Sequence, residues 1–164
     1  MDTGDMLAAR EFEIPPEMTA GELFEALAPV GAELLAETLV KLDAGEITPV
    51  KQDDSQATYA PMISKEAAVI NYNKDAKSVV DLVRGLNPNP VARTEIKGNR
   101  LKVYKAALGE TTARPAGEAY EKDGCIAVAC GDGREVLLSE VQGEGGKRMD
   151  SAAYLRGHPV FNEE

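Results

Sequence analysis

The chain has 164 residues, with 18 Lys and Arg against 28 Asp and Glu, one His, two Cys and no Trp. With 43% apolar residues it is expected to form a packed core, which excludes an intrinsically disordered chain. No apolar run approaches the roughly 18 residues of a membrane helix, and the acidic start does not resemble a signal peptide, so we expect a soluble, cytoplasmic protein.

A long amphipathic helix is predicted over residues 19–44. Thr19 and Glu22 have the spacing of a capping box, in which both side chains accept backbone N–H groups at the start of a helix. Pro29 removes one backbone hydrogen bond and predicts a kink or a break. Gly45 predicts the C-terminal end. Apolar residues follow at helical spacing: Leu23, Leu27, Val30, Leu34, Leu35, Leu39 and Leu42.

Charge is distributed unevenly between residues 1–60 and residues 61–164. The first part has 3 basic and 13 acidic side chains, a balance of −10, whereas the second has 15 of each. Helical periodicity is lost over residues 47–63, where an extended piece and a polar linker are expected. The acidity therefore belongs to one segment, and it does not exclude nucleic acid binding by the rest.

Two shorter helices are predicted further along the chain. The first covers residues 75–86 and ends before Pro88 and Pro90, which cannot continue the backbone hydrogen bonds. Ser151 is predicted to cap the second, over residues 152–156. The apolar stripe of the first helix consists of Val79, Leu82, Val83 and Leu86.

After Pro90 the hydrophobic period changes to two, which indicates strands. They are separated by the turn sequences Gly98-Asn99, Asp123-Gly124 and Gly131-Asp132-Gly133, which hairpins require. Five short strands at this spacing predict a small antiparallel barrel or sandwich. The expected strands lie near 91–97, 100–108, 116–121, 125–130 and 134–141.

Few residues suggest an independent catalytic or metal site. Cys125 and Cys130 lie on opposite faces of a predicted strand, about 16 Å apart, and are not expected to form a disulfide or a zinc site. Residues 143–148 (Gly-Glu-Gly-Gly-Lys-Arg) lack the spacing of a phosphate-binding loop. His158 has no nearby Cys or paired carboxylate, which favours a packing or surface role over that of a base.

The basic residues are more suggestive of a function. Arg100 and Lys102 are expected on one face of a strand, and Lys147 and Arg148 follow the last predicted strand. If the last two fold back beside the strand, the patch suits a phosphate backbone. A solvated charged face, partly neutralised by acidic residues, remains the alternative.

Several segments together resemble the methionyl-tRNA formyltransferase family. Their order and spacing along nearly the whole chain make the match specific, although each motif alone is weak. They comprise Asp2-Thr3-Gly4-Asp5-Met6-Leu7, residues 23–39, Ala57-Thr58-Tyr59-Ala60-Pro61 with Ser64-Lys65-Glu66, residues 82–88, Ala129-Cys130-Gly131-Asp132-Gly133, Gly146-Lys147-Arg148-Met149 and residues 155–159.

The resemblance implies an α+β fold. Residues 1–50 would be the C-terminal remnant of a Rossmann-like formyltransferase domain, and residues 51–63 a linker. Residues 64–164 would be a tRNA-binding domain, in which a leading helix precedes a small antiparallel Greek-key, OB-like β-barrel. The intact family member is expected to be monomeric.

The resemblance also implies a reaction. The family transfers a formyl group from 10-formyltetrahydrofolate to the amino group of methionyl initiator tRNA, with an Asn, a His and an Asp in its site. Of these three, only Asp2 has a counterpart here. We therefore expect the chain alone to be inactive and to bind no folate cofactor, metal or membrane.

By position in the family, five residues are expected to contact phosphates of the initiator tRNA. Clustering alone adds Lys97, Arg100 and Lys105 as weaker candidates. Such contacts would weaken steeply with salt. The five are Lys65, Arg84, Lys102, Lys147 and Arg148.

Three departures from the family pattern stand out. Asn89 lies where the family usually has Trp between two prolines, so a large apolar anchor is missing. Without the preceding sheet, the apolar face of the 19–44 helix would be exposed, and the chain is expected to self-associate. Met1 replaces a family Leu, which suggests a truncated gene or a misassigned start.

Two alternatives to a piece of methionyl-tRNA formyltransferase stay open. One is a stand-alone tRNA- or RNA-binding barrel with an acidic helical appendage. The other is part of a related formyltetrahydrofolate-using enzyme that acts on sugar nucleotides, or of formyltetrahydrofolate dehydrogenase. The residues that determine the substrate are expected to lie largely in parts of these enzymes that have no counterpart in this sequence.

Overall fold

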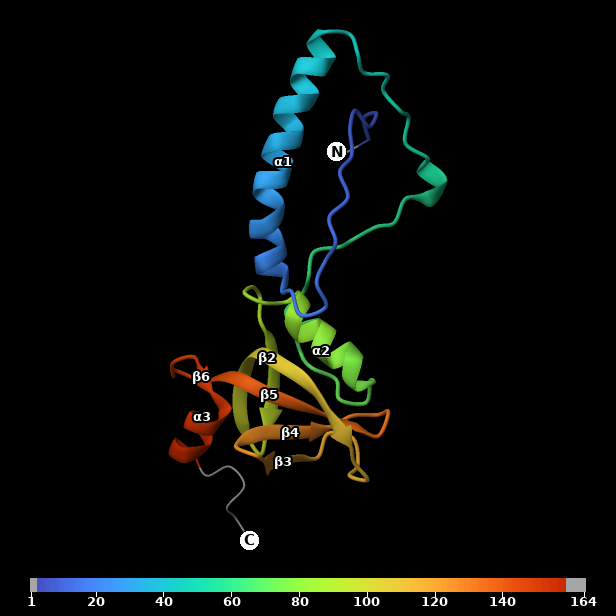
Figure 1. The fold of residues 1–164 in the computed structure, drawn as a ribbon. Helices are drawn as coiled ribbons and strands as arrows, with labels where there is room; N and C mark the ends of the chain where they lie inside the picture. Colours follow the sequence, from blue (N-terminus) through green and yellow to red (C-terminus); the bar gives the residue numbers. More distant parts are fainter. Residues whose placement is uncertain (1–2, 159–164) are drawn as a thin grey trace. The chain divides into compact units, whose positions relative to one another are not determined.

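The structure, a computed structural model, describes residues 3–158. Internal contacts divide the chain between Met62 and Ile63 into two units (Figure 1). Asp2, the one residue matched to the family's catalytic site, lies outside the described residues. None of the described helices is both long and apolar enough to cross a membrane.

The first unit is built on helix α1 (Ala20–Asp43). The predicted capping box is present: Glu22 N donates to Thr19 Oγ1 over 3.3 Å, and Thr19 N donates to Glu22 Oε2 over 2.8 Å. At the other end Gly45 has a φ of +72°, and its N–H donates to the Leu42 carbonyl, as expected for a C-terminal glycine.

Helix α1 continues through Pro29, so of the kink or break expected there the break is absent (Figure 1). Proline removes the hydrogen bond to the carbonyl four residues earlier, that of Glu25. Both residues are exposed, and water can satisfy this carbonyl. The helix therefore tolerates the loss.

Contacts between distant segments hold the rest of the first unit together. Met6 and Val50 form an antiparallel bridge, with N···O distances of 2.8 and 2.9 Å. Arg10 donates to Glu33 over 3.2 Å and to Glu37 over 3.0 Å, and thereby ties the N-terminal segment to α1. Further on, the expected linker contains one 3-10 turn, η1 (Asp54–Gln56).

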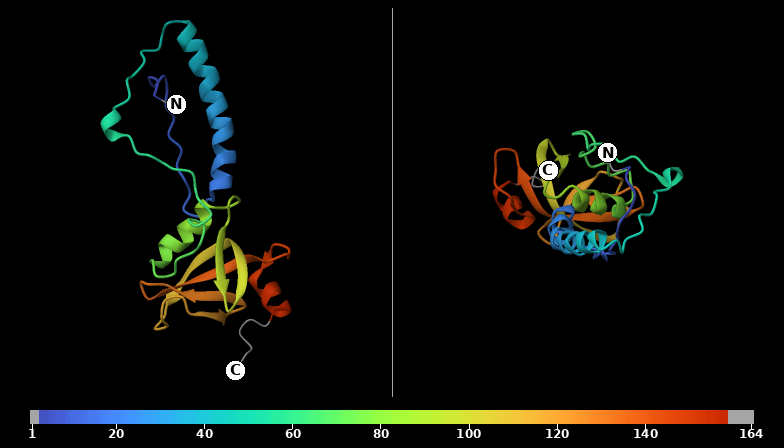
Figure 2. Two further views of the ribbon diagram at one scale, coloured as in Figure 1. Left: turned by 180° about the vertical axis from the view of Figure 1, so that it is seen from behind. Right: turned by 90° about the horizontal axis from the view of Figure 1, so that it is seen from above.

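The second unit begins with helix α2 (Ala76–Gly85) and continues into the sheet. Asp75 caps α2 and accepts from Ser78 N over 2.8 Å. Of the predicted stripe, Val79, Val83 and Leu86 are buried in the core, which confirms the helical prediction. Figure 2 shows α2 against one end of the curved sheet.

All five predicted strands are present, although several bounds differ. The second is longer than expected, because it bends through a β-bulge and continues to Thr111. The third begins later, at Ala119. The strands are β1 (Ala92–Ile96), β2 (Asn99–Thr111), β3 (Ala119–Lys122), β4 (Cys125–Ala129), β5 (Arg134–Gly143) and a short β6 (Met149–Asp150) that was not predicted.

The strands form one antiparallel sheet in the order β1-β2-β5-β4-β3, with β6 paired to β5. The α+β class is therefore confirmed. Among the described residues β1 and β3 are the edges and do not pair with each other. The expected closed barrel is thus not present as a hydrogen-bonded ring. Whether a sheet closes depends on the tilt and stagger of its strands, which the local sequence pattern does not reveal.

Helix α3 (Ser151–Gly157) packs against β5 and β6. Its cap is Asp150, which accepts from Ala153 N over 2.7 Å, so the prediction of Ser151 as cap is wrong. The Ser151 hydroxyl is buried and donates to the Leu138 carbonyl instead. Tyr154 closes the core on this side.

Candidate nucleic-acid interface

Three neighbouring strands present a row of polar side chains on their exposed face. In register, Arg93 of β1 lies opposite Lys102 of β2, and Lys102 lies opposite Gln142 of β5. The residues that alternate with them in β2, Leu101 and Val103, are buried. The period of two predicted from the sequence therefore separates the core from a cationic outer face.

A second row on this face is electrically balanced. Glu95 of β1 pairs in register with Arg100 of β2, and the two charged groups are 3.7 Å apart. Within residues 3–158, by contrast, Arg93, Lys102 and Lys147 form no ion pair. The surplus positive charge of this surface therefore belongs to these three residues.

The face is hollowed into a groove of about 500 Å³. One wall is the turn after β5, and another is Val69, which forms a parallel bridge with Arg93. All the lining residues belong to the second unit. They are Val69, Arg93, Thr94, Glu95, Arg100, Leu101, Lys102, Gln142, Gly143, Glu144 and Gly145.

Both ends of the Gln142 side-chain amide are engaged within the protein. Its Oε1 accepts from Tyr104 Oη over 2.8 Å, and its Nε2 donates to the Gly146 carbonyl over 2.8 Å. Gln142 therefore fixes the turn after β5, and its amide is held in place by Tyr104 and by the backbone of Gly146.

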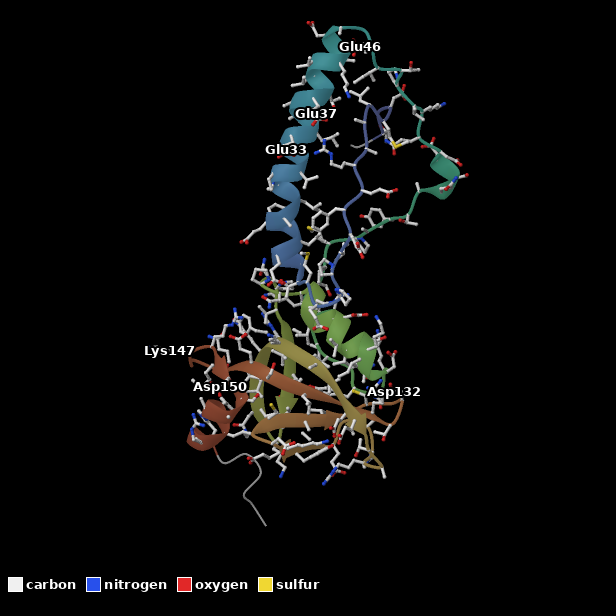
Figure 3. All side chains as sticks on the ribbon, viewed as in Figure 1. Glu33, Glu37, Glu46, Asp132, Lys147 and Asp150 are labelled. Atoms are coloured by element: carbon white, nitrogen blue, oxygen red, sulfur yellow. The ribbon has the colours of Figure 1, made fainter. Side chains whose placement is uncertain are left out.

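Lys147 and Arg148 lie in the same turn but in different surroundings. Lys147 is exposed at the edge of the domain (Figure 3). Arg148 donates twice to Glu140, with both distances 2.6 Å, and its guanidinium lies 4.4 Å from the centre of the Tyr104 ring. The hydrogen bonds from Arg148 hold the pKa of Glu140 below its ordinary value.

The other predicted contacts do not line the groove. Lys65 is exposed in a turn before α2, and Arg84 on α2 donates to Asp81 over 3.1 Å. Lys97 is in the β1–β2 turn with a φ of +47°, and Lys105 is exposed at the bulge of β2. The structure thus places only Lys102 of the five in the groove, with Lys147 and Arg148 on its bordering turn.

Arg93 and Tyr104 were not predicted from the sequence as residues of this surface. Arg93 is in a predicted strand at even spacing from Glu95, so its exposed face was readable. The sequence does not reveal that Arg93 lies opposite Lys102, because this register depends on how the strands pair. Tyr104 looked like an ordinary strand residue.

A second cluster of charges, around the buried Glu135, connects strands of the sheet. Glu135 is 1% exposed and accepts from Lys122 Nζ, from Tyr120 Oη and from Glu110 N. Burial raises the pKa of Glu135, but these hydrogen bonds outweigh it, and the net pKa is lowered. The carboxylate therefore stays charged and joins β5 to β2 and β3.

The remaining chemical candidates are packing residues. Cys125 and Cys130 are both free, and His158 stacks on Tyr154 with ring centres 4.3 Å apart. Within the described part of the chain, no group of His, Cys, Asp and Glu is arranged to hold a metal. In the described second unit, the groove combines a hollow surface with cations that have no ion-pair partner.

Comparison with known families matches residues 62–159 to the formyl transferase C-terminal domain. This match covers more than half of the chain and includes the whole groove. The chain belongs to the formyltransferase family. The resemblance stated from the sequence motifs is thereby confirmed at the level of the family.

Curated relatives are similar over nearly the full chain. Methionyl-tRNA formyltransferase of Acetivibrio thermocellus is 45% identical over 100% of this chain, and that of Lachnospira eligens is 42% identical over 98%. In both cases the match covers 53% of the relative. The chain spans about half the length of the curated relatives it matches.

Two solved structures share the fold at low identity. HypX from Aquifex aeolicus, in complex with tetrahydrofolic acid, matches 98% of this chain and 28% of its own with a TM-score of 0.71 and 19% identity. An N-formyltransferase from Helicobacter canadensis matches 84% of this chain and 51% of its own with a TM-score of 0.62 and 17% identity. At these identities the likeness concerns the fold alone.

Proposed function

We propose that the chain is the C-terminal part of a cytoplasmic methionyl-tRNA formyltransferase and supplies its binding surface for initiator methionyl-tRNA. The intact protein would transfer a formyl group from 10-formyltetrahydrofolate to the methionyl amino group. The observation that carries the binding role is the row of Arg93 and Lys102 beside Lys147, none of which has an acidic partner in the second unit as described.

The groove suits the backbone of RNA better than its bases. In its lining the unpaired cations Arg93 and Lys102 outweigh the unpaired Glu144, and cations neutralise phosphates and position a nucleic acid without reading sequence. Gln142, the amide that would read a base, is committed to Tyr104 and Gly146. We expect Lys65, Arg84 and Arg148 to contribute less than Lys102 and Lys147, because Lys65 is in neither the groove nor its bordering turn and the two arginines are in ion pairs.

The groove does not fit a folate. Its lining contains no aromatic residue on which a flat pterin ring could stack. The folate and the catalytic groups, including the partners of Asp2, would belong to the other half of the protein. We therefore propose that this chain alone is inactive.

The first unit fits the role of a catalytic-domain remnant at residues 1–50, joined by a linker at 51–63. Helix α1 buries only Thr38, and Phe24, Leu35 and Val40 are exposed. An apolar helix face of this kind normally packs against further structure. For residues 64–164, the order β2-β5-β4-β3 is that of a Greek key, which supports an OB-like barrel.

A stand-alone RNA-binding role is a second candidate. The observation that favours it is that the groove is complete within the second unit, so binding does not require the rest of a formyltransferase. The sugar-nucleotide alternative has only fold-level likeness behind it.

The test combines binding and catalysis with the full 164-residue chain. Fluorescence anisotropy with labelled initiator tRNA should show binding at low salt that weakens steeply as salt is raised. A formylation assay with methionyl-tRNA and 10-formyltetrahydrofolate should show no product. Salt-insensitive binding or no binding would contradict the binding role, and enzyme-dependent formylation would contradict the proposed inactivity.

A further inference from the structure

We infer that Arg148 is a positioning residue rather than a phosphate ligand. Through Glu140 it fixes the turn that carries Lys147, and so places that lysine at the border of the groove. This inference rests on the proposed function, because it assigns a role within the same RNA-binding surface. It differs from the sequence-based expectation, in which Arg148 itself contacts phosphate.

The donors of Arg148 are already engaged within the protein. Nε donates to Glu140 Oε1 and Nη2 to Glu140 Oε2, both over 2.6 Å. Two parallel bonds of this kind are the geometry in which Arg binds a carboxylate or a phosphate most strongly. One flat side of the guanidinium is covered by the Tyr104 ring at 4.4 Å. A phosphate would have to displace Glu140 to gain the same contact.

The ion pair also cancels the charge of Arg148. Glu140 and Arg148 are a neutral unit beside the groove, whereas Lys147 has no acidic partner among the described residues. Long-range attraction of a polyanion depends on surplus charge. Lys147 therefore supplies the attraction, and Arg148 supplies the geometry.

The turn is held on both sides of Lys147. On one side Gln142 Nε2 donates to the Gly146 carbonyl over 2.8 Å, and Tyr104 Oη holds Gln142. On the other side the Arg148–Glu140 pair ties the turn to β5, where Glu140 faces Asp150 of β6. The same turn contains Gly145, just before the first tie, at a φ of +69°. Loss of the ion pair would leave only the short β5–β6 pairing, Glu140 with Asp150 and Val141 with Met149, to hold this side of the turn.

The substitution Glu140→Gln should change RNA affinity in opposite directions, depending on whether Arg148 positions the turn or binds phosphate. If Arg148 positions the turn, RNA binding should weaken by about fivefold, although a negative charge has been removed. If Arg148 is a phosphate ligand restrained by Glu140, binding should tighten. Glu144→Gln is the matched control, because it removes the same charge from an exposed residue of the same turn without breaking an ion pair.

A measurement without RNA tests the turn itself. Trypsin cleaves after Lys147 and Arg148, and Glu140→Gln leaves both sites intact. We expect cleavage at these bonds to be several times faster in Glu140→Gln than in Glu144→Gln or in the unmodified chain, under conditions where all three are folded. Arg148→Lys, which keeps the charge but cannot form the two-pronged pair, should also speed cleavage after Lys147.

The inference requires both faster cleavage and weaker binding in Glu140→Gln than in Glu144→Gln. Unchanged cleavage, or RNA affinity equal to or above that of Glu144→Gln, would overturn it while leaving the proposed function intact. If the unmodified chain binds no RNA, the proposed function fails, and the binding role of Arg148 fails with it.

Discussion

Arg93 and Lys102 lie directly opposite each other on the paired strands β1 and β2, and both side chains are exposed. Like charges at opposed positions destabilise a sheet. The next pair along the same strands, Glu95 and Arg100, has the stabilising arrangement. The cationic pair therefore lowers stability where an acidic residue would have raised it, which is expected of a site that binds an anion from outside.

This relationship predicts opposite effects of one substitution on stability and on binding. Lys102→Thr should raise the free energy of unfolding by about 0.3 kcal/mol, because it removes the repulsion from Arg93 and introduces a residue favoured in strands. The same change should weaken RNA binding several-fold. Urea unfolding and fluorescence anisotropy measure the two quantities.

Arg100→Thr is the matched control on the same strand and face. It breaks the pair with Glu95, so the free energy of unfolding should fall slightly rather than rise. Equal effects of Lys102→Thr and Arg100→Thr on stability would show that the opposed cations carry no repulsion.

A close approach of two turns predicts a strong effect of one glycine. A Cβ at Gly131 would lie 2.0 Å from the Asn73 carbonyl oxygen, which is backbone and cannot move alone. Gly131→Ala should therefore lower the free energy of unfolding by about 3 kcal/mol. In Gly85→Ala, at the end of α2, nothing lies within 4 Å, and stability should stay equal or rise. Similar thermal midpoints for the two variants would refute this assignment.

The two cysteines should differ in reactivity. Cys130 is 2% exposed, and burial raises the pKa of its thiol to about 11, so thiolate is scarce and poorly accessible at pH 8. Cys125 is partly exposed and should react first with a thiol reagent. Mass spectrometry of partly labelled protein identifies the modified residue, and equal labelling of both in the folded chain would contradict the burial of Cys130.

The raised pKa of Cys130 also predicts a dependence of stability on pH. As pH rises above about 9, the thiol ionises in the unfolded chain before it ionises in the folded one. Ionisation stabilises the unfolded state, so the free energy of unfolding falls until the folded chain also ionises, at about pH 11. The stability advantage of the unmodified chain over Cys130→Ala should therefore narrow between pH 9 and 11. A constant difference across this range would be inconsistent with the shifted pKa.

The exposed apolar face of α1 predicts self-association of the chain. Leu35 and Leu39, four residues apart on this helix, are 59% and 56% exposed. Sedimentation should show concentration-dependent association that Leu35→Glu and Leu39→Glu together reduce. Ala32→Glu, which adds one negative charge at an exposed position and removes no large apolar side chain, should have a smaller effect. A chain that is monomeric at all concentrations would contradict this expectation.

Local signals in the sequence predicted most of the helices and strands. The capping box of Thr19 and Glu22 and the glycine at position 45 work within one turn of helix, and the period of two marked the strands of the sheet. The open order of the sheet and the short β6 depend on pairing between distant strands, which no local pattern contains.

The candidate site was predicted only in part for the same reason. Lys102 and Lys147 were recognised as cations, but the opposed Arg93 and the neutralisation of Arg148 by Glu140 depend on strand register and on a turn that folds back. Asp150 rather than Ser151 caps α3 for a tertiary reason as well, because the Ser151 hydroxyl donates to the Leu138 carbonyl.

The most direct test of the account is the dependence of initiator tRNA affinity on salt, measured for the unmodified chain and for the triple variant Arg93→Ala, Lys102→Ala, Lys147→Ala. Each lost phosphate contact should reduce the slope of log K against log salt by roughly one unit. We therefore predict a slope shallower by about three units in the variant and much weaker binding at low salt. An unchanged slope and affinity would show that RNA does not bind at this groove.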